Sequence, residues 1–228
     1  MKLKTTNLLK LDKTIAKDLF AGEDRPWNIL PKISQFILEL GKQLDVDKFD
    51  RRADDIWVAK SAKISQTACL SGPLIVDEDA EIRHCAYIRG SVIVGKGAVI
   101  GNSTEIKNSI LFDGVQVPHY NYVGDSILGY KAHMGAGSIT SNIKSDKGLV
   151  KILCDNKKIH TGLRKFGAVL GNCVEVGCNA VLNPGTIIGK NSTVYPLCSV
   201  RGVVPENCIY KSNSVCIKRD IAKIQYTV

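Results

Sequence analysis

The sequence has no long apolar stretch. Across its 228 residues, no window approaches the roughly 18 uninterrupted apolar residues that a membrane span needs. Residues 1–7 are basic, but they lack the apolar centre and the small-residue cleavage site of a signal peptide. We therefore expect a cytoplasmic protein with no membrane partner.

A dense basic stretch is also missing, although the chain is basic overall. It has 31 Lys and Arg against 22 Asp and Glu, for a formal charge of +9. Nucleic-acid-binding proteins gather such charge on one patch, often with aromatic residues interleaved. Here the lysines are scattered, which favours a solvated surface with a site for an anionic small molecule. We expect no nucleic-acid partner.

The cysteines lack the CxxC spacing of a zinc ribbon. One of them takes the small-residue position of the repeat described next, and others fall where tight corners are expected. We expect small buried thiols in a reducing compartment rather than disulfides. The eight are Cys69, Cys85, Cys154, Cys173, Cys178, Cys198, Cys208 and Cys216.

Branched aliphatic residues recur every six residues from Val58 to Ile106 and again from Leu170 to Val200. A mostly small residue follows each of them four positions later, as Ala62 follows Val58. Six is not a helical period, because a turn of 3.6 residues would rotate these side chains off any one face. It suits a short strand and a tight corner, repeated, with each aliphatic residue stacking on its equivalents in adjacent coils. The sequence predicts an all-β fold, a parallel β-helix of hexapeptide repeats.

Two features interrupt the repeat. The register slips between Ile106 and Leu128, and residues 142–166 leave the pattern. Within that segment, residues 149–153 and 158–161 flank Asp155-Asn156, which predicts a protruding hairpin. Interruptions of a solenoid often carry function, because a regular rod has few clefts.

The N-terminal residues do not follow the repeat. Residues Ile33–Leu44 have the spacing of an amphipathic helix that starts after Pro31, and Leu9–Phe20 is a weaker helical stretch. Solenoids need terminal caps, so this short N-terminal helical segment is expected to cover the open end of the β-helix. The expected division is 1–55 for the N-terminal helical cap, 56–204 for the β-helix with its protruding loop 142–166, and 205–228 for a C-terminal tail.

Several strings of this repeat match one known family in content and in spacing. They are Ile88-Arg89-Gly90, Gly101-Asn102, Glu105-Ile106-Lys107, the residues from His119 to Asp125 and those from Met134 to Asn142. Through them, residues 58–205 resemble the left-handed β-helix acetyltransferase domain of the bifunctional N-acetylglucosamine-1-phosphate uridylyltransferase/glucosamine-1-phosphate acetyltransferases. Nothing in residues 1–57 resembles the glycine-rich nucleotide loop of that family's other half, so uridylyl transfer is not expected of this sequence.

The resemblance implies a left-handed coil, a homotrimer with sites between subunits, and an acetyl-CoA-dependent N-acetyltransferase. The acceptor would be a hexosamine phosphate or a nucleotide-linked amino sugar. Acetyl transfer needs a neutral amine, and histidine is the natural general base at neutral pH. His119 lies where the family has its catalytic base. Arg89 and Lys107, a planar fork and a point charge, match the acceptor-binding positions together with Tyr122.

The coenzyme site is matched less completely. In the family, the region of Gly135–Gly137 meets the pantetheine arm and acetyl group of the coenzyme, and Ala136 and Asn142 match by residue. Cys178 and Pro196 stand where the later coenzyme positions are serine and alanine. We assign all four of these side chains to the coenzyme site, and we expect no metal for acyl transfer.

The acceptor pocket also departs from the family. His133 replaces an asparagine, and Ile143 replaces a tyrosine. A histidine is bulkier than asparagine and becomes cationic as pH falls. We expect His133 to change acceptor specificity, in a wider and anion-friendly pocket, rather than to act as a second base. Asp125 is expected either to orient His119 or to fill a corner.

Two other classes of protein stay open. A γ-type carbonic anhydrase needs three zinc-binding histidines, two of them closely spaced, whereas His119 and His133 are 14 residues apart and no H-x4-H pair occurs. A non-catalytic solenoid that binds a sugar nucleotide or organises a complex is the stronger alternative, because Ile143, Cys178 and Pro196 depart from the family. Binding of acetyl-CoA would distinguish it from the enzyme.

Overall fold

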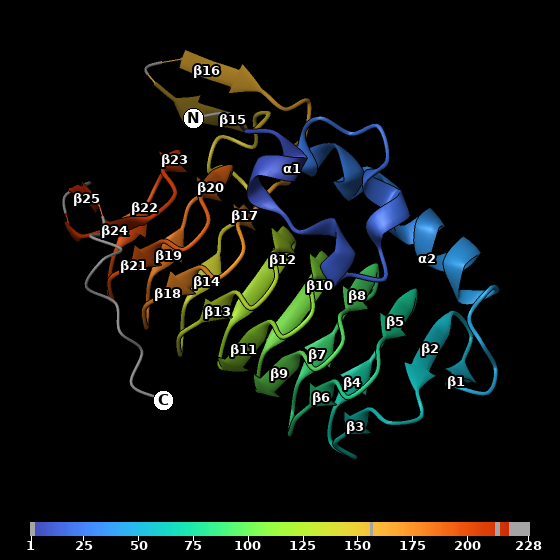
Figure 1. Cartoon of the computed structure of the whole chain (residues 1–228). Helices are drawn as coiled ribbons and strands as arrows, with labels where there is room; N and C mark the ends of the chain where they lie inside the picture. The colour runs from blue at the N-terminus through green and yellow to red at the C-terminus, as the bar shows by residue number, and fades with distance from the viewer. Residues whose placement is uncertain (1–2, 156, 213–214, 219–228) are drawn as a thin grey trace.

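The repeat forms a parallel β-helix of short strands (Figure 1). The computed structural model describes residues 3–155, 157–212 and 215–218. Glu81 pairs in register with Lys63 on one side and Val99 on the other, each 18 residues away. Three hexapeptides therefore make one coil, and the fold is the left-handed β-helix that the resemblance implied.

Each coil contributes strands to three faces. Face 1 contains β2 (Ile56–Ala59), β5 (Leu74–Val76), β8 (Val92–Val94), the ends of β10 (Glu105–Leu111) and β12 (Tyr122–Leu128), β17 (Ala168–Leu170), β20 (Thr186–Ile188) and β23 (Val203–Val204). Face 2 contains β3 (Lys63–Ile64), β6 (Glu81–Ile82), β9 (Val99–Asn102), β11 (Gln116–His119), β13 (His133–Met134), β18 (Glu175–Val176), β21 (Thr193–Val194) and β24 (Cys208–Tyr210). Face 3 contains β4 (Cys69–Leu70), β7 (Tyr87–Ile88), the starts of β10 and β12, β14 (Ile139–Thr140), β19 (Val181–Leu182) and β22 (Ser199–Val200).

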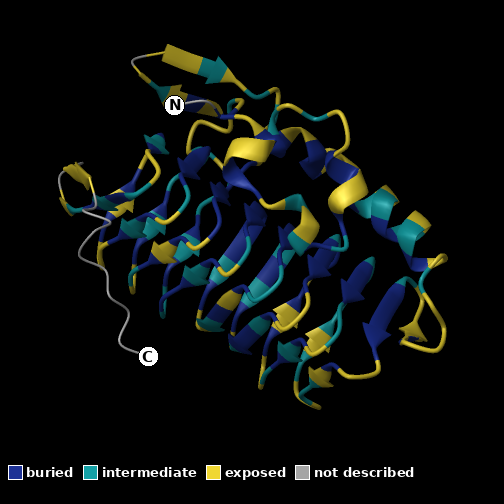
Figure 2. Cartoon of the chain, viewed as in Figure 1, coloured by how far each residue is buried: buried dark blue, intermediate teal, exposed yellow. Residues whose placement is uncertain are grey.

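The interior of the coil is a stack of the predicted aliphatic residues. Val76, Ile100 and Leu182, one from each face, are completely buried. Figure 2 shows how buried residues recur along the strands of successive coils. Burial of each such side chain stabilises the fold by about 1.5–3 kcal/mol relative to exposure. Because each coil buries its faces on its neighbours, the stack supplies most of the hydrophobic core.

The predicted register slip has a local cause at the corner between faces 3 and 1, here called corner 3. Ile88 and Val92 are four residues apart across this corner, whereas their register partners Ile106 and Ser109 are three apart. The next coil is shortened in the same way. Two successive coils therefore have 17 residues, and the strict period of six fails there.

The helical part of the N-terminal segment lies along face 1 and not on an open end, so the predicted helical cap is wrong, although the last strand of the segment, β1 (Phe49–Ala53), pairs with the first coil. Its helix α2 (Ile33–Gly41) contacts β5, β8 and β10, and a 3₁₀ segment η3 (Pro26–Lys32) contacts β12. The reason is a second apolar row that points outward from face 1. Ile75, Ile93 and Ile127 belong to it, and all three are fully buried. A face with such a row has to be covered.

The remaining N-terminal elements are short. The helix predicted for Ile33–Leu44 is confirmed, and it ends three residues early. The helix predicted for Leu9–Phe20 is wrong, because Thr14 is extended and its hydroxyl accepts a hydrogen bond from the backbone N–H of Ala16. Two 3₁₀ turns form instead. The elements are α1 (Thr5–Leu8), η1 (Leu11–Lys13), η2 (Lys17–Phe20) and β1 (Phe49–Ala53).

The hairpin predicted within 142–166 is confirmed. Strands β15 (Lys151–Cys154) and β16 (Lys157–His160) pair antiparallel. This insertion leaves the coil at corner 3, between β14 and β17, and folds back over face 1 beside β23 (Figure 1). Val150 and Ile152 are fully buried against their own chain. The base of the insertion is therefore anchored on its own β-helix.

Antiparallel strands cover both ends of the β-helix. Strand β1 pairs with β2 at the start, and β25 (Cys216–Lys218) pairs with β24 at the other end. The β-helix thus continues to Tyr210, beyond the predicted boundary at 204, and the tail predicted from residue 205 begins later. Residues 213–214 and 219–228 of that tail lie outside the described part.

The cysteines are free thiols, but most are not buried as predicted. Only Cys198 and Cys208 are buried, whereas Cys85, Cys173 and Cys178 are exposed at corners. The corners turn their side chains outward, which is why a tight turn did not mean burial. Separately, none of the helices in the described residues is long and apolar enough to cross a membrane.

Candidate active site

His119 lies at the corner between faces 2 and 3, here called corner 2, at the end of β11. Its backbone carbonyl accepts a hydrogen bond from Gly137 of the next coil, and the Asn102 carbonyl of the preceding coil accepts one from Tyr120. The residue after each corner position has a positive φ, 51° at Tyr120 and 71° at Gly137. The corner-2 column that these bonds define is His84, Asn102, His119, Ala136, Cys178 and Pro196.

The His119 side chain projects from this corner into solvent. Its backbone N–H donates to Asn121 Oδ1 at 3.0 Å, which fixes the corner. Its ring nitrogens make no hydrogen bond to any residue that the structure describes. His84 in the same column differs, because its ring contacts Thr67 Oγ1 at 2.7 Å and Cys85 Sγ at 3.2 Å. A ring free of partners is available to take a proton from a ligand.

Three of the four predicted coenzyme residues follow His119 down the same edge. Ala136, Cys178 and Pro196 occupy successive coils of the corner-2 column. At Gly137 a Cβ would lie 2.1 Å from Asn179 Oδ1, so a side chain there would require Asn179 to move. Ala136, Cys178 and Pro196 are small and uncharged, and they line this edge of the β-helix in three successive coils.

Arg89 and Lys107 lie at the opposite edge of face 3, near corner 3, and both are already paired. Arg89 Nη1 donates to Glu105 Oε1 at 2.7 Å, and Lys107 Nζ lies 3.6 Å from Asp125 Oδ2. The bond to Glu105 raises the pKa of Arg89. The two cations stack in adjacent coils, as their spacing predicted, but an anionic ligand would have to share them with these carboxylates.

Asp125 does not orient His119. Its carboxylate accepts hydrogen bonds from Asn108 Nδ2 at 2.8 Å and from Asn142 Nδ2, and it is 4% exposed. It occupies the shortened corner 3, which is the second role predicted for it. Asn142, the fourth predicted coenzyme residue, is therefore tied to the base of the insertion and lies away from the corner-2 column.

Tyr122 joins this cluster on face 3. Its hydroxyl accepts a hydrogen bond from Asn142 Nδ2 at 3.2 Å. Burial raises the pKa of the phenol, and the nearby Asp125 carboxylate acts in the same direction. The phenol is therefore neutral and keeps its own O–H to donate to a ligand.

His133 lies on face 2, apart from the residues of face 3. Its Nδ1 is 2.8 Å from Oε2 of Glu175, the register partner on β18. Sequence reasoning missed Glu175, because the insertion places it 42 residues from His133. Sequence reasoning also missed Glu105 as the partner of Arg89. A coil of three hexapeptides places these two residues on neighbouring strands, so this pair could have been found.

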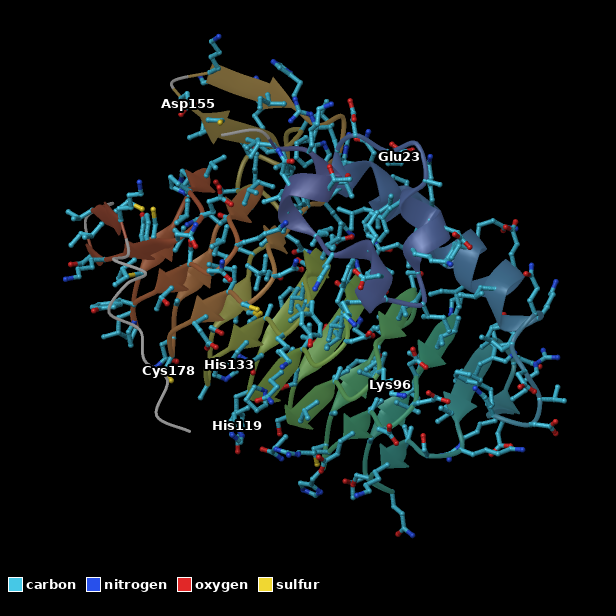
Figure 3. The ribbon with its side chains drawn as sticks, in the orientation of Figure 1. Glu23, Lys96, His119, His133, Asp155 and Cys178 are labelled. Atoms are coloured by element: carbon cyan, nitrogen blue, oxygen red, sulfur yellow. The ribbon has the colours of Figure 1, made fainter. Side chains whose placement is uncertain are left out.

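The predicted residues thus form three groups around one rod. His119 heads the corner-2 column, the cations and Tyr122 lie near corner 3, and His133 lies on face 2. Face 3 is about three residues wide, so the first two groups are on the order of 10 Å apart. His119, His133 and Cys178 all lie on the side away from the N-terminal segment and the insertion (Figure 3). Among the described residues, no three His, Cys, Asp or Glu side chains are grouped to hold a metal ion.

These features define a hexapeptide-repeat β-helix with polar residues gathered at two of its corners. The family model of the GMPPB C-terminal domain matches residues 70–183. This is half of the chain, so the protein belongs to that family. The matched residues include all of the predicted site except Pro196.

Curated relatives carry the names of bifunctional enzymes. The "Bifunctional protein GlmU" of Methanococcus maripaludis strain S2 is 35% identical over 114 residues, which are 50% of this chain and 28% of the relative. The "Bifunctional sugar-1-phosphate nucleotidylyltransferase/acetyltransferase" of Sulfurisphaera tokodaii is 38% identical over 90 residues, 40% of this chain and 22% of the relative. The chain thus matches about a quarter of the length of these relatives.

Solved structures of acyltransferases are similar at lower identity. A point mutant of AntD, an N-acyltransferase from Bacillus cereus in complex with dTDP and coenzyme A, is 14% identical with a TM-score of 0.41. The match covers 77% of this chain and 91% of that one. The UDP-N-acetylglucosamine acyltransferase of Francisella novicida is 15% identical with a TM-score of 0.39, over 72% and 68% of the two chains. Likeness at this level carries no conclusion about activity here.

Proposed function

We propose that the protein is an N-acetyltransferase that uses acetyl-CoA. The acceptor is the amino group of a hexosamine phosphate or of a nucleotide-linked amino sugar. The observation that carries the proposal is the corner-2 column, where the unpartnered ring of His119 heads a track of Ala136, Cys178 and Pro196. The acetyltransferase name of the Sulfurisphaera tokodaii relative supports the same class of reaction.

The chemistry assigns one proton transfer to His119. The amine nitrogen attacks the thioester carbonyl carbon, and a C–N bond forms. As the nitrogen becomes positive, the His119 ring takes its proton, and the C–S bond then breaks to release the coenzyme thiolate. The ring returns the proton to that thiolate, so that the products are an N-acetyl sugar and the free thiol.

Acceptor binding is assigned to the residues near corner 3. Arg89 and Lys107 together provide two positive charges in adjacent coils, and Tyr122 provides a neutral O–H donor. A phosphate placed between the cations would replace part of their pairing with Glu105 and Asp125. The amino end of the sugar would then extend across face 3 toward His119.

The test is an acyl-transfer assay on the intact chain. Acetyl-CoA is mixed with a panel of hexosamine phosphates and nucleotide-linked amino sugars, and thiol release is recorded. Turnover with at least one amino sugar is expected. Acetyl-CoA binding without turnover on any acceptor would favour the non-catalytic alternative, and no binding at all would reject both the donor and the reaction.

We predict that the active form is a homotrimer. The three groups of site residues lie on the convex outside of one rod, and a neighbour's surface is needed to close a pocket over them. Sedimentation velocity at micromolar protein should show a species of three chains. A purely monomeric sample with full acetyl transfer would contradict this prediction.

We predict that Arg89→Ala and Lys107→Ala weaken binding of phosphorylated acceptors. Loss of one charge-assisted contact should raise KM for a hexosamine phosphate by about tenfold to a hundredfold, with a smaller change for the dephosphorylated sugar. Arg83→Ala is the matched control, since Arg83 forms a similar pair with Glu81 on face 2. Equal effects on both acceptors would remove the phosphate assignment.

A further inference from the structure

The His133–Glu175 pair on face 2 is built by the fold alone. Strands β13 and β18 are adjacent and parallel, although the insertion separates them in sequence. The carboxylate lies 2.8 Å from Nδ1, and Nε2 makes no hydrogen bond among the described residues. Both side chains are accessible, at 36% for His133 and 52% for Glu175.

This geometry decides which nitrogen of the ring faces a ligand. The carboxylate accepts a hydrogen bond from Nδ1–H, so the neutral ring carries its lone pair on Nε2. The other register partner of His133 is Gln116 on β11, and Thr193 follows Glu175 on β21. Both are uncharged, so among these neighbours on face 2 the charge beside the His133 ring is the negative charge of Glu175. That charge disfavours binding of an anion.

We infer that Glu175 is a positioning residue, and that with its help His133 binds a hydrogen-bond donor of the acceptor sugar, an amino or hydroxyl group. This inference rests on the proposed function and replaces the anion-friendly pocket expected for His133. The Glu175 carboxylate, bonded to Nδ1 at 2.8 Å, places negative charge beside the ring, which disfavours phosphate there, and it leaves the Nε2 lone pair to accept from a donor. The phosphate stays with the cations near corner 3.

The position of His133 relative to His119 fits one elongated ligand. His133 lies beside Gln116 of the neighbouring strand β11, and Gln116 is three residues before His119 on that strand. Strand and coil spacings put the two backbone positions on the order of 10 Å apart. The cations near corner 3 lie on the other side of His119, so a ligand that reaches both groups has to be elongated. A nucleotide-linked amino sugar meets this requirement, with its amine at His119, its sugar extending over face 2 to the Nε2 atom of His133, and its phosphates at the cations.

The orienting role is tested by nitrogen NMR of the histidine rings at alkaline pH, with His133→Asn used to assign the signal. The wild-type ring should be a single tautomer protonated at Nδ1, and Glu175→Ala should give a mixture. The control is Glu81→Ala, which removes a carboxylate from the same column of face 2 and should leave the signal unchanged. A wild-type ring protonated at Nε2 would overturn the inference. This measurement needs no activity, so it stands even if the proposed reaction is wrong.

The specificity role is tested by a double-mutant cycle. Glu175→Ala should raise KM for the amino sugar about three- to tenfold with kcat nearly unchanged, and Glu175→Gln should recover most of the loss because its amide oxygen still accepts from Nδ1–H. In a His133→Asn background, Glu175→Ala should have no further effect. A fall in kcat with unchanged KM would mean that the pair takes the proton. Independent effects of the two substitutions would mean that Glu175 does not act through His133, and either result would overturn the assignment.

Discussion

The variant His119→Ala should lose acetyl transfer by about 10²–10⁴-fold in kcat and keep its fold, because general base catalysis contributes that much. The corner itself is fixed by the backbone N–H of His119 and by Asn121, neither of which the substitution removes. Thiol release at saturating acetyl-CoA measures the rate, and a circular dichroism melt checks the fold.

His84→Ala is the matched control for this experiment. His84 occupies the same corner-2 column two coils earlier, but its ring is held by Thr67 and Cys85. Its replacement should leave the rate close to that of the wild type. If His119→Ala retains near-normal turnover, or if both variants lose activity equally, His119 is not the base.

The variant Phe166→Ala should lower the free energy of unfolding by about 3–5 kcal/mol, since it leaves a large cavity. Phe166 is fully buried, and its ring centroid lies 6.0 Å from that of Trp27. Its backbone accepts a hydrogen bond from Gly185 and donates one to Asn142, so it joins the insertion and the N-terminal segment to the β-helix. Denaturant unfolding measures the change, and limited proteolysis should show earlier cleavage within 142–166.

Leu149→Ala provides the comparison for Phe166→Ala. Leu149 belongs to the same insertion, but it is 48% exposed. Its loss should change stability by no more than about 0.5 kcal/mol. Equal stability of the two variants would show that Phe166 does not anchor the insertion.

The fold was predictable because the six-residue period is fixed by the stacking of aliphatic residues. The period of six describes only the inward positions, so it did not predict the outward row of Ile75, Ile93 and Ile127. That row was visible in the sequence, and it would have predicted a covered face and placed the N-terminal segment on it. The direction in which the insertion folds could not be predicted, because it depends on Val150 and Ile152 packing against strands that come later in the chain.

The positions of candidate site residues were predictable where the repeat is regular, and their partners were not predictable where it is interrupted. Once each coil length is known, His119 and Ala136 fall in one column. Glu175 was not predictable as a partner of His133, because the repeat is interrupted between them. The sequence does not show at which residue the chain rejoins the coil after the insertion, and so which residue lies beside His133. The pairing of Lys107 with Asp125 depended on the shortened corner, which the sequence showed only as a slip in period.

That shortened corner shows that the coils of one β-helix can differ in length and still stack. Where corner 3 keeps its full length, Gly90 and Ser91 turn the chain, whereas in the shortened coils Asn108 and Asp125 hold the turn and bond to each other. Each of the two shortened coils therefore contains one repeat of five residues, and Asp125 at that corner is almost completely buried. The full-length corner at Gly90 and Ser91 is hydrogen-bonded directly to the shortened corner at Asn108, so corners of both lengths stack on one another. A rod of near-identical coils can thus hold a buried polar centre at a corner that is one residue short.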